Sequence, residues 1–74
     1  MAIYYKRINS TYEDVPTFGI ALFIRNGNCS QLIKAVPDLS TDRMAVEKLV
    51  GLCNDLRLDP IHLDDVVEDF LTGM

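Results

Sequence analysis

Residues 17–36, which read TFGIALFIRNGNCSQLIKAV, carry the clearest structural pattern in this sequence. Apolar side chains recur at every second position along 17–25, a period that is typical of a strand with one face on a core. The dipeptide Asn26-Gly27 follows, and it is a strong signature of a tight hairpin turn. The pattern predicts two antiparallel strands, 17–25 and 28–36, with a core face made of Phe18, Ile20, Leu22 and Ile24.

A two-residue Asn26-Gly27 turn would pair Arg25 with Asn28 and so set the register of this hairpin. The face opposite the core then gathers four apolar side chains, those of Phe23, Ala21, Leu32 and Val36. Contiguous apolar patches on small soluble proteins usually mark contacts. We therefore expect this face to bind a partner or a second copy of the chain, unless residues 10–16 fold back over it.

The segments before and after the hairpin supply one more strand and one boundary. Residues 2–9 are rich in aromatic and β-branched side chains, which favours a first strand. The polar residues 10–16 are expected to form its connection to the hairpin. Pro37 is expected to end the third strand, because proline cannot donate a ladder hydrogen bond.

Two amphipathic helices are predicted after the strands. Residues 42–57 show a helical period, with Ser40 or Thr41 as the expected N-cap. Asp59-Pro60 begins a second helix, because aspartate caps well and proline suits the first helical position. Gly73 closes this helix. The expected buried stripes are Val46, Leu49, Val50, Cys53 and Leu56 in the first helix, and Leu63, Val66, Val67, Phe70 and Leu71 in the second.

This order of elements predicts an α+β fold in one domain, residues 1–74. A three-stranded antiparallel sheet (β-β-β) would occupy 1–37, and a two-helix hairpin packed on one face of that sheet would occupy 38–74. A chain of 74 residues has room for one thin core and little room for a deep substrate cavity.

The charges of the chain are unevenly distributed. Residues 1–37 carry four basic and two acidic side chains, a net charge of +2, whereas 38–74 carry three basic and nine acidic ones, a net charge of −6. An acidic half argues against direct nucleic-acid binding, which needs clustered lysine and arginine. A membrane-spanning helix needs about 18 consecutive apolar residues, and no run in this sequence approaches that length. The first residues also lack the pattern of a secretory signal, so a cytoplasmic location is expected.

Four carboxylates, Asp64, Asp65, Glu68 and Asp69, are predicted on the face of the second helix opposite its buried stripe. They form like-charge i,i+4 pairs that cost the helix a few tenths of a kcal/mol each. Two readings stay open, a solvated face that aids solubility and a docking surface for a basic partner. The side chains spread too widely around one helix to surround a metal ion.

No catalytic residue, cofactor site or metal site is predicted. Cys29 and Cys53 are expected to be buried free thiols, with a Cys29–Cys53 disulfide as the alternative. His62 lies three residues from both Asp59 and Asp65, but no nucleophile motif accompanies it. A small enzyme or ligand-binding domain that uses His62 with a carboxylate or a cysteine remains the alternative function.

The second half of the chain resembles a known family. The resemblance rests on Ser40-Thr41-Asp42, 46–50, 52–54, 60–63 and 65–71. These residues are similar to a group of short proteins, found mainly in Gram-positive anaerobic bacteria, that form a domain of unknown function. The resemblance implies a small cytoplasmic bacterial protein and supplies no activity, cofactor or site residue.

Taken together, these patterns predict a small non-catalytic protein-interaction module. Its sharper form is an acidic inhibitor or regulator of a protein with a basic surface. The expected contact residues are Asp64, Asp65, Glu68, Asp69, Phe23 and Leu32.

Overall fold

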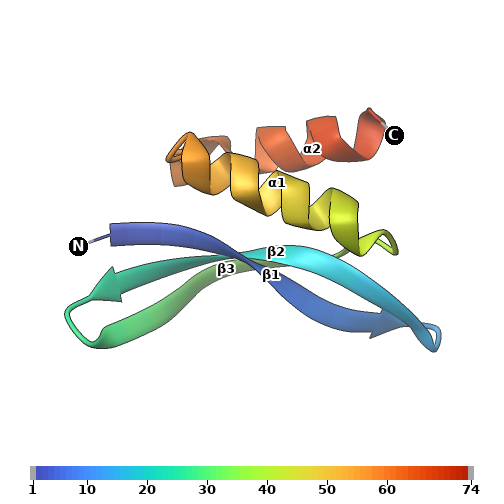
Figure 1. Cartoon of the computed structure of the whole chain (residues 1–74), viewed down its shortest axis with the longest axis horizontal. Coiled ribbons are helices and arrows are strands. Elements are labelled where there is room, and N and C mark those ends of the chain that lie inside the picture. The colour runs from blue at the N-terminus through green and yellow to red at the C-terminus, as the bar shows by residue number, and fades with distance from the viewer. Residues whose placement is uncertain (1, 74) are drawn as a thin grey trace.

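The computed structural model describes residues 2–73, and Figure 1 shows an open sheet with both helices on one side of it. The predicted α+β fold is confirmed, with the antiparallel strand order β1-β2-β3. The other face of the sheet carries no helix (Figure 1). The elements are β1 (Ala2–Tyr12), β2 (Val15–Asn26), β3 (Cys29–Ser40), α1 (Arg43–Asp55), the 3-10 turn η1 (Pro60–His62) and α2 (Leu63–Thr72).

Two-residue turns join the strands at opposite ends of the sheet. Glu13 and Asp14 both have positive φ, 50° and 66°, which is the type I′ geometry that matches strand twist. β1 therefore runs on to Tyr12, and the prediction of a connection over 10–16 is wrong. These residues lie in the strands and at the end of the sheet, so they do not fold back over its bare face (Figure 1).

The second turn lies one residue later than predicted. Asn26 pairs with Cys29, so Gly27 and Asn28 form the turn, and Gly27 takes a positive φ of 64°. Glycine enters this conformation without the steric cost that a Cβ imposes. The predicted pairing of Arg25 with Asn28 is therefore wrong, and Arg25 pairs with Ser30.

β3 continues past Pro37 to Ser40, which contradicts the predicted strand end. Proline is tolerated there because β3 is an edge strand with an irregular register. Register shifts occur between Leu22 and Phe23 and again between Phe18 and Ile20. As a result Val36 pairs with Ile20 and lies on the helix side of the sheet, not on the bare face as predicted.

The second register shift depends on Gly19. A Cβ at this position would lie 2.2 Å from the carbonyl oxygen of Val36 and 2.8 Å from Cα of Pro37. Only a residue without a side chain lets the β3 backbone approach so closely. Just beyond the crossing, Asp38 adopts a positive φ of 59° and accepts a 2.5 Å hydrogen bond from the Thr17 hydroxyl.

The core lies between the sheet and the helices, as the alternation of β2 predicted. Ile20 is completely buried and Leu22 is nearly so, while Phe18 packs at the margin. In β1, Tyr5 faces the core. The buried hydrophobic cluster consists of Tyr5, Ile20, Leu22, Leu39, Val46, Leu49, Val50, Cys53, Leu63 and Val67.

The helix boundaries correct two predictions. Asp42 is the N-cap of α1, since its carboxylate accepts hydrogen bonds from the backbone N–H groups of Met44 and Ala45. Ser40 instead accepts a bond from the N–H of Asp42. α1 ends at Asp55, so Leu56 lies outside the helix and is exposed, contrary to its predicted place in the core.

The predicted second helix begins as a 3-10 turn. Asp59 caps it by accepting a 3.1 Å hydrogen bond from the N–H of Ile61, with Pro60 in the first turn. The N–H of Gly73 closes α2 on the carbonyl of Asp69, as expected. Leu63 and Val67 are buried, whereas Leu71 is exposed and does not join the predicted stripe.

Candidate interaction surface

The bare face of the sheet carries an aromatic pair. Tyr4 and Phe23 are cross-strand partners whose rings stack with centroids 5.2 Å apart and planes 10° from parallel. Stacked aromatic pairs of this kind add to the stability of a sheet beyond simple burial. The guanidinium of Arg25 lies 5.3 Å from the centroid of the Tyr4 ring, so a cation covers one end of the pair.

The register extends this pair across all three strands. Phe23 is also the partner of Leu32, and cross-strand partners share one face of a sheet. The predicted contact residues Phe23 and Leu32 are therefore brought together, although the register that joins them was not the predicted one. We call the following residues the outer sheet patch: Tyr4, Ile8, Phe23 and Leu32. Ala21 shares this face, as predicted, but is completely buried and offers no contact surface.

The carboxylates of α2 lie on the helical side of the molecule, away from the outer sheet patch (Figure 1). All four predicted residues, Asp64, Asp65, Glu68 and Asp69, are exposed. The Asp64 carboxylate forms an ion pair with the ammonium of Lys34 in β3. Exposed pairs contribute about 0–1 kcal/mol, so this one anchors α2 only weakly.

A hydrogen-bonded side chain ties β1 to the helices. The Asn54 amide accepts a 2.7 Å bond from the N–H of Tyr5 and donates a 2.9 Å bond to its carbonyl. It thus occupies the outer edge of β1 as a neighbouring strand would. The Tyr5 hydroxyl donates to the carbonyl of Leu58, and burial, with smaller contributions from Cys53 and Asp59, raises the pKa of this phenol.

The structure does not bring His62 together with either cysteine, as the alternative enzyme function would need. His62 is exposed in η1 and is absent from the lining of the two cavities described below. Cys53 is buried in the core, and burial raises the pKa of its thiol. Cys29 is exposed beside the shifted turn, contrary to the predicted burial, and both cysteines are free thiols. Within residues 2–73, no group of three or more histidine, cysteine or carboxylate side chains could hold a metal ion.

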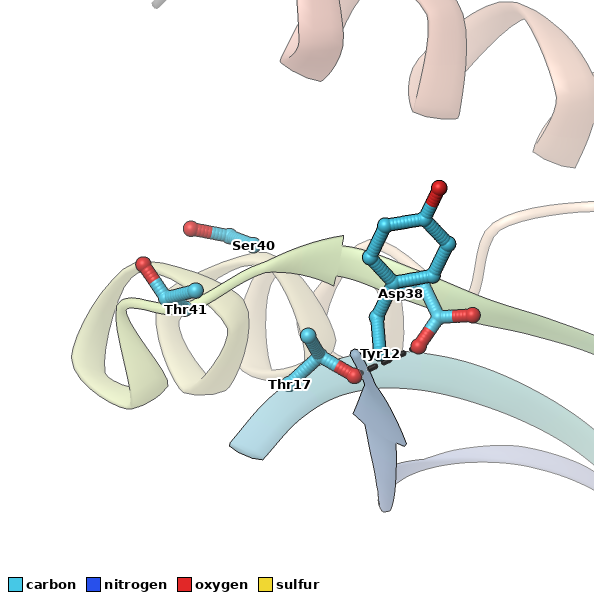
Figure 2. Close-up of a pocket in the computed structure, with 5 residues that line it drawn as sticks. All are labelled: Tyr12, Thr17, Asp38, Ser40 and Thr41. Carbon is cyan, nitrogen blue, oxygen red and sulfur yellow. Dashed lines mark hydrogen bonds between the residues drawn. The ribbon is translucent and has the colours of Figure 1, made fainter. Parts of the chain in front are cut away.

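Two cavities on the surface of the described residues are well defined. The larger, about 660 Å³, is lined by Ala2, Ile3, Tyr4, Asn54 and Arg57. The smaller, about 220 Å³, is lined by Tyr12, Thr17, Asp38, Ser40 and Thr41 and is shown in Figure 2. Sequence reasoning missed this second group, because it assumed that β1 ends at residue 9 and β3 at Pro37.

No helix within residues 2–73 is both long enough and apolar enough to cross a membrane. Comparison with curated proteins and with solved structures finds no match for the chain. A family model described as "Family of unknown function (DUF6514)" matches residues 1–73. This match confirms the resemblance to a domain of unknown function, and the chain belongs to that family.

Proposed function

We propose that this chain is a small, non-catalytic protein-binding module whose contact surface is the outer sheet patch. The observation that carries this proposal is the row of apolar side chains that crosses three strands on a face without helices. Leu32 in this row remains 53% exposed. A contiguous apolar surface of this kind is the usual mark of a protein contact.

The total exposed area supports the same reading. A compact protein of 8.3 kDa is expected to expose about 4,600 Å². This chain exposes 5270 Å², an excess of about 700 Å². A standard interface buries about 800 Å² on each partner. The surplus, summed over the whole chain, is therefore comparable in size with the area that one partner protein covers.

The strand edges are poorly suited to take up an additional strand, which favours contact through the face. Asn54 already bonds both backbone groups of Tyr5 at the outer edge of β1. β3 carries Pro37, Lys34 and two register shifts. Prolines, lysines and bulges are the devices by which edge strands resist pairing with another chain.

The charge of the molecule indicates the chemistry of the partner. The net charge is −4, and three of the four carboxylates of α2 have no ion-pair partner within residues 2–73. These carboxylates lie on the helical side of the molecule, so their long-range field speeds the encounter with a basic protein, whereas the outer sheet patch, where Arg25 lies against Tyr4, supplies the apolar contact. By covering part of such a partner, the chain would act as its regulator or inhibitor in the cytoplasm.

The test is affinity capture from lysate with a matched pair of variants. Leu32→Ser removes an apolar side chain from the outer sheet patch, and Leu52→Ser removes the same side chain, equally exposed at 53%, from α1. We expect Leu32→Ser to lose a basic partner that the parent and Leu52→Ser both retain. Circular dichroism melts establish that both variants stay folded.

Three outcomes would argue against the proposal. Loss of the partner with Leu52→Ser alone would move the interface to the helical side. Equal capture by all three proteins would remove the outer sheet patch from the contact. A dimer of the chain in sedimentation, disrupted by Leu32→Ser, would make a second copy the occupant of the face in place of a basic partner.

A further inference from the structure

We infer that the cavity between Tyr12 and Asp38 binds a guanidinium or ammonium group, presented by an arginine or lysine side chain of a partner protein. The assignment of this cation to a partner protein rests on the proposed function. The cation-binding chemistry of the cavity rests on its own residues, which Figure 2 shows.

The walls of the cavity combine an aromatic ring and a carboxylate. Tyr12 is 61% exposed, and it lines the same cavity of about 220 Å³ as Asp38 (Figure 2). The Thr17 hydroxyl holds Oδ1 of Asp38 at 2.5 Å (Figure 2). This is the one hydrogen bond to that carboxylate within residues 2–73, so its second oxygen is available to another donor. Aromatic faces and carboxylates both attract cations.

The fold itself does not require a negative charge at position 38. The positive φ of 59° is tolerated by asparagine as well as aspartate. An asparagine side chain could also accept the hydroxyl hydrogen bond of Thr17 through its carbonyl oxygen. The 2.5 Å distance is typical of a charge-assisted bond, which occupies one oxygen of the Asp38 carboxylate. The second oxygen shares the negative charge and can accept a hydrogen bond from a cation.

The surroundings of the cavity strengthen its preference for cations. Tyr12 is followed directly by the turn residues Glu13 and Asp14, which are both exposed. Thr17, the hydrogen-bond donor to Asp38, follows that turn at the start of β2. Three carboxylates thus lie at this end of the sheet, and summed charges of one sign raise the local concentration of the opposite sign.

The probe is arginine amide, titrated into the ¹⁵N-labelled full chain and followed by two-dimensional NMR. We expect saturable shifts at the amides of Tyr12, Thr17 and Asp38, with millimolar affinity. Citrulline amide, a neutral analogue of nearly the same shape, should leave these amides unmoved. Equal shifts with both probes, or no shift with arginine amide, would overturn the inference.

Matched variants identify the groups that bind. Asp38→Asn keeps the backbone conformation and should weaken binding of arginine amide about three- to fivefold. Tyr12→Leu should weaken it about two- to fivefold, through loss of the ring face. Asp14→Asn is the control, since Asp14 also has a positive φ but does not line the cavity, and its effect should stay below about twofold. Unchanged binding by Asp38→Asn would refute the site.

A second arm separates this inference from the proposed function. If Asp38→Asn weakens capture of the basic partner, the cation belongs to that partner. If capture is unchanged while arginine amide still binds, the assignment to a partner side chain is wrong. If arginine amide causes no shifts in the NMR titration, the cation site is wrong, but the proposed function, which depends on capture through Leu32, is unaffected. If Leu32→Ser captures the basic partner as well as the parent does, the proposed function is wrong, but the cation site is unaffected by that result.

Discussion

Replacement of Gly19 by alanine should destabilise the fold, although the same replacement at Gly51 should stabilise it. An alanine Cβ at position 19 would lie 2.2 Å from the carbonyl oxygen of Val36, and ordinary contacts begin near 3.4 Å. The obstructing atoms belong to the backbone, so β3 must move by more than about 1 Å to make room. At position 51, within α1, no atom lies within 4 Å of the added Cβ apart from the neighbouring helix backbone.

The expected magnitudes follow from this geometry. Overpacking costs about 1–3 kcal/mol, partly offset by about 0.4–1 kcal/mol because alanine restricts the unfolded chain. A net loss of about 1–2 kcal/mol would lower Tm by about 4–16 °C in a domain of this size. Gly51→Ala should raise the stability by up to about 1 kcal/mol, the difference in helix propensity. A Gly19→Ala protein that melts at or above the parent temperature would refute the described crossing of β2 and β3.

Three further predictions follow from individual contacts. Asn54→Ala should lower the free energy of unfolding by about 1–2 kcal/mol, because the N–H and the carbonyl of Tyr5 both lose their hydrogen-bond partner. It should also speed hydrogen exchange at the Tyr5 amide, and unchanged exchange there would contradict these two hydrogen bonds. Asp64→Lys should be less stable in urea than Asp65→Lys, because both residues lie in the first turn of α2 and only Asp64 pairs with Lys34; equal midpoints would mean that this pair contributes nothing. The urea midpoint should be constant between about pH 7 and pH 9 and fall at higher pH, because the raised pKa values of the Cys53 thiol and the Tyr5 phenol keep these groups protonated in the folded chain after they ionise in the unfolded one. Tyr5→Phe should remove the part of the fall in urea midpoint that occurs above pH 10. A midpoint that stays constant up to pH 11 would contradict the burial of the Cys53 thiol and the Tyr5 phenol.

Patterns with a local physical cause were predictable from the sequence. The alternation along β2 identified Ile20 and Leu22 as core residues, because a strand has a strict period of two. Asp59-Pro60 identified the start of the second helical segment, because both residues act within one turn. The separation of strands from helices was enough to predict the α+β class.

Features that depend on non-local geometry were not predictable. The Asn26-Gly27 signature indicated a turn but did not determine which two residues form it. In the structure the turn consists of Gly27 and Asn28, and Gly27, its first residue, takes the positive φ. Pro37 would have ended a central strand but is tolerated in the edge strand β3.

The smaller cavity and the Lys34–Asp64 pair are non-local in the same way. Thr17 and Asp38 meet only because the register shifts beside Gly19. Lys34 and Asp64 lie 30 residues apart and meet only because the chain folds α2 back to the helix-bearing side of the sheet. No spacing rule in the sequence connects either pair.

The central claim, that the outer sheet patch is the protein-binding surface, is tested most directly by photocrosslinking. A photoreactive phenylalanine is placed at position 32 in β3 in one protein and at position 52 in α1 in another, two sites of equal exposure. After irradiation in lysate, we expect the position 32 protein to form a covalent adduct with one basic partner and the position 52 protein to form none. An adduct from position 52 alone, or none from either position, would contradict the account.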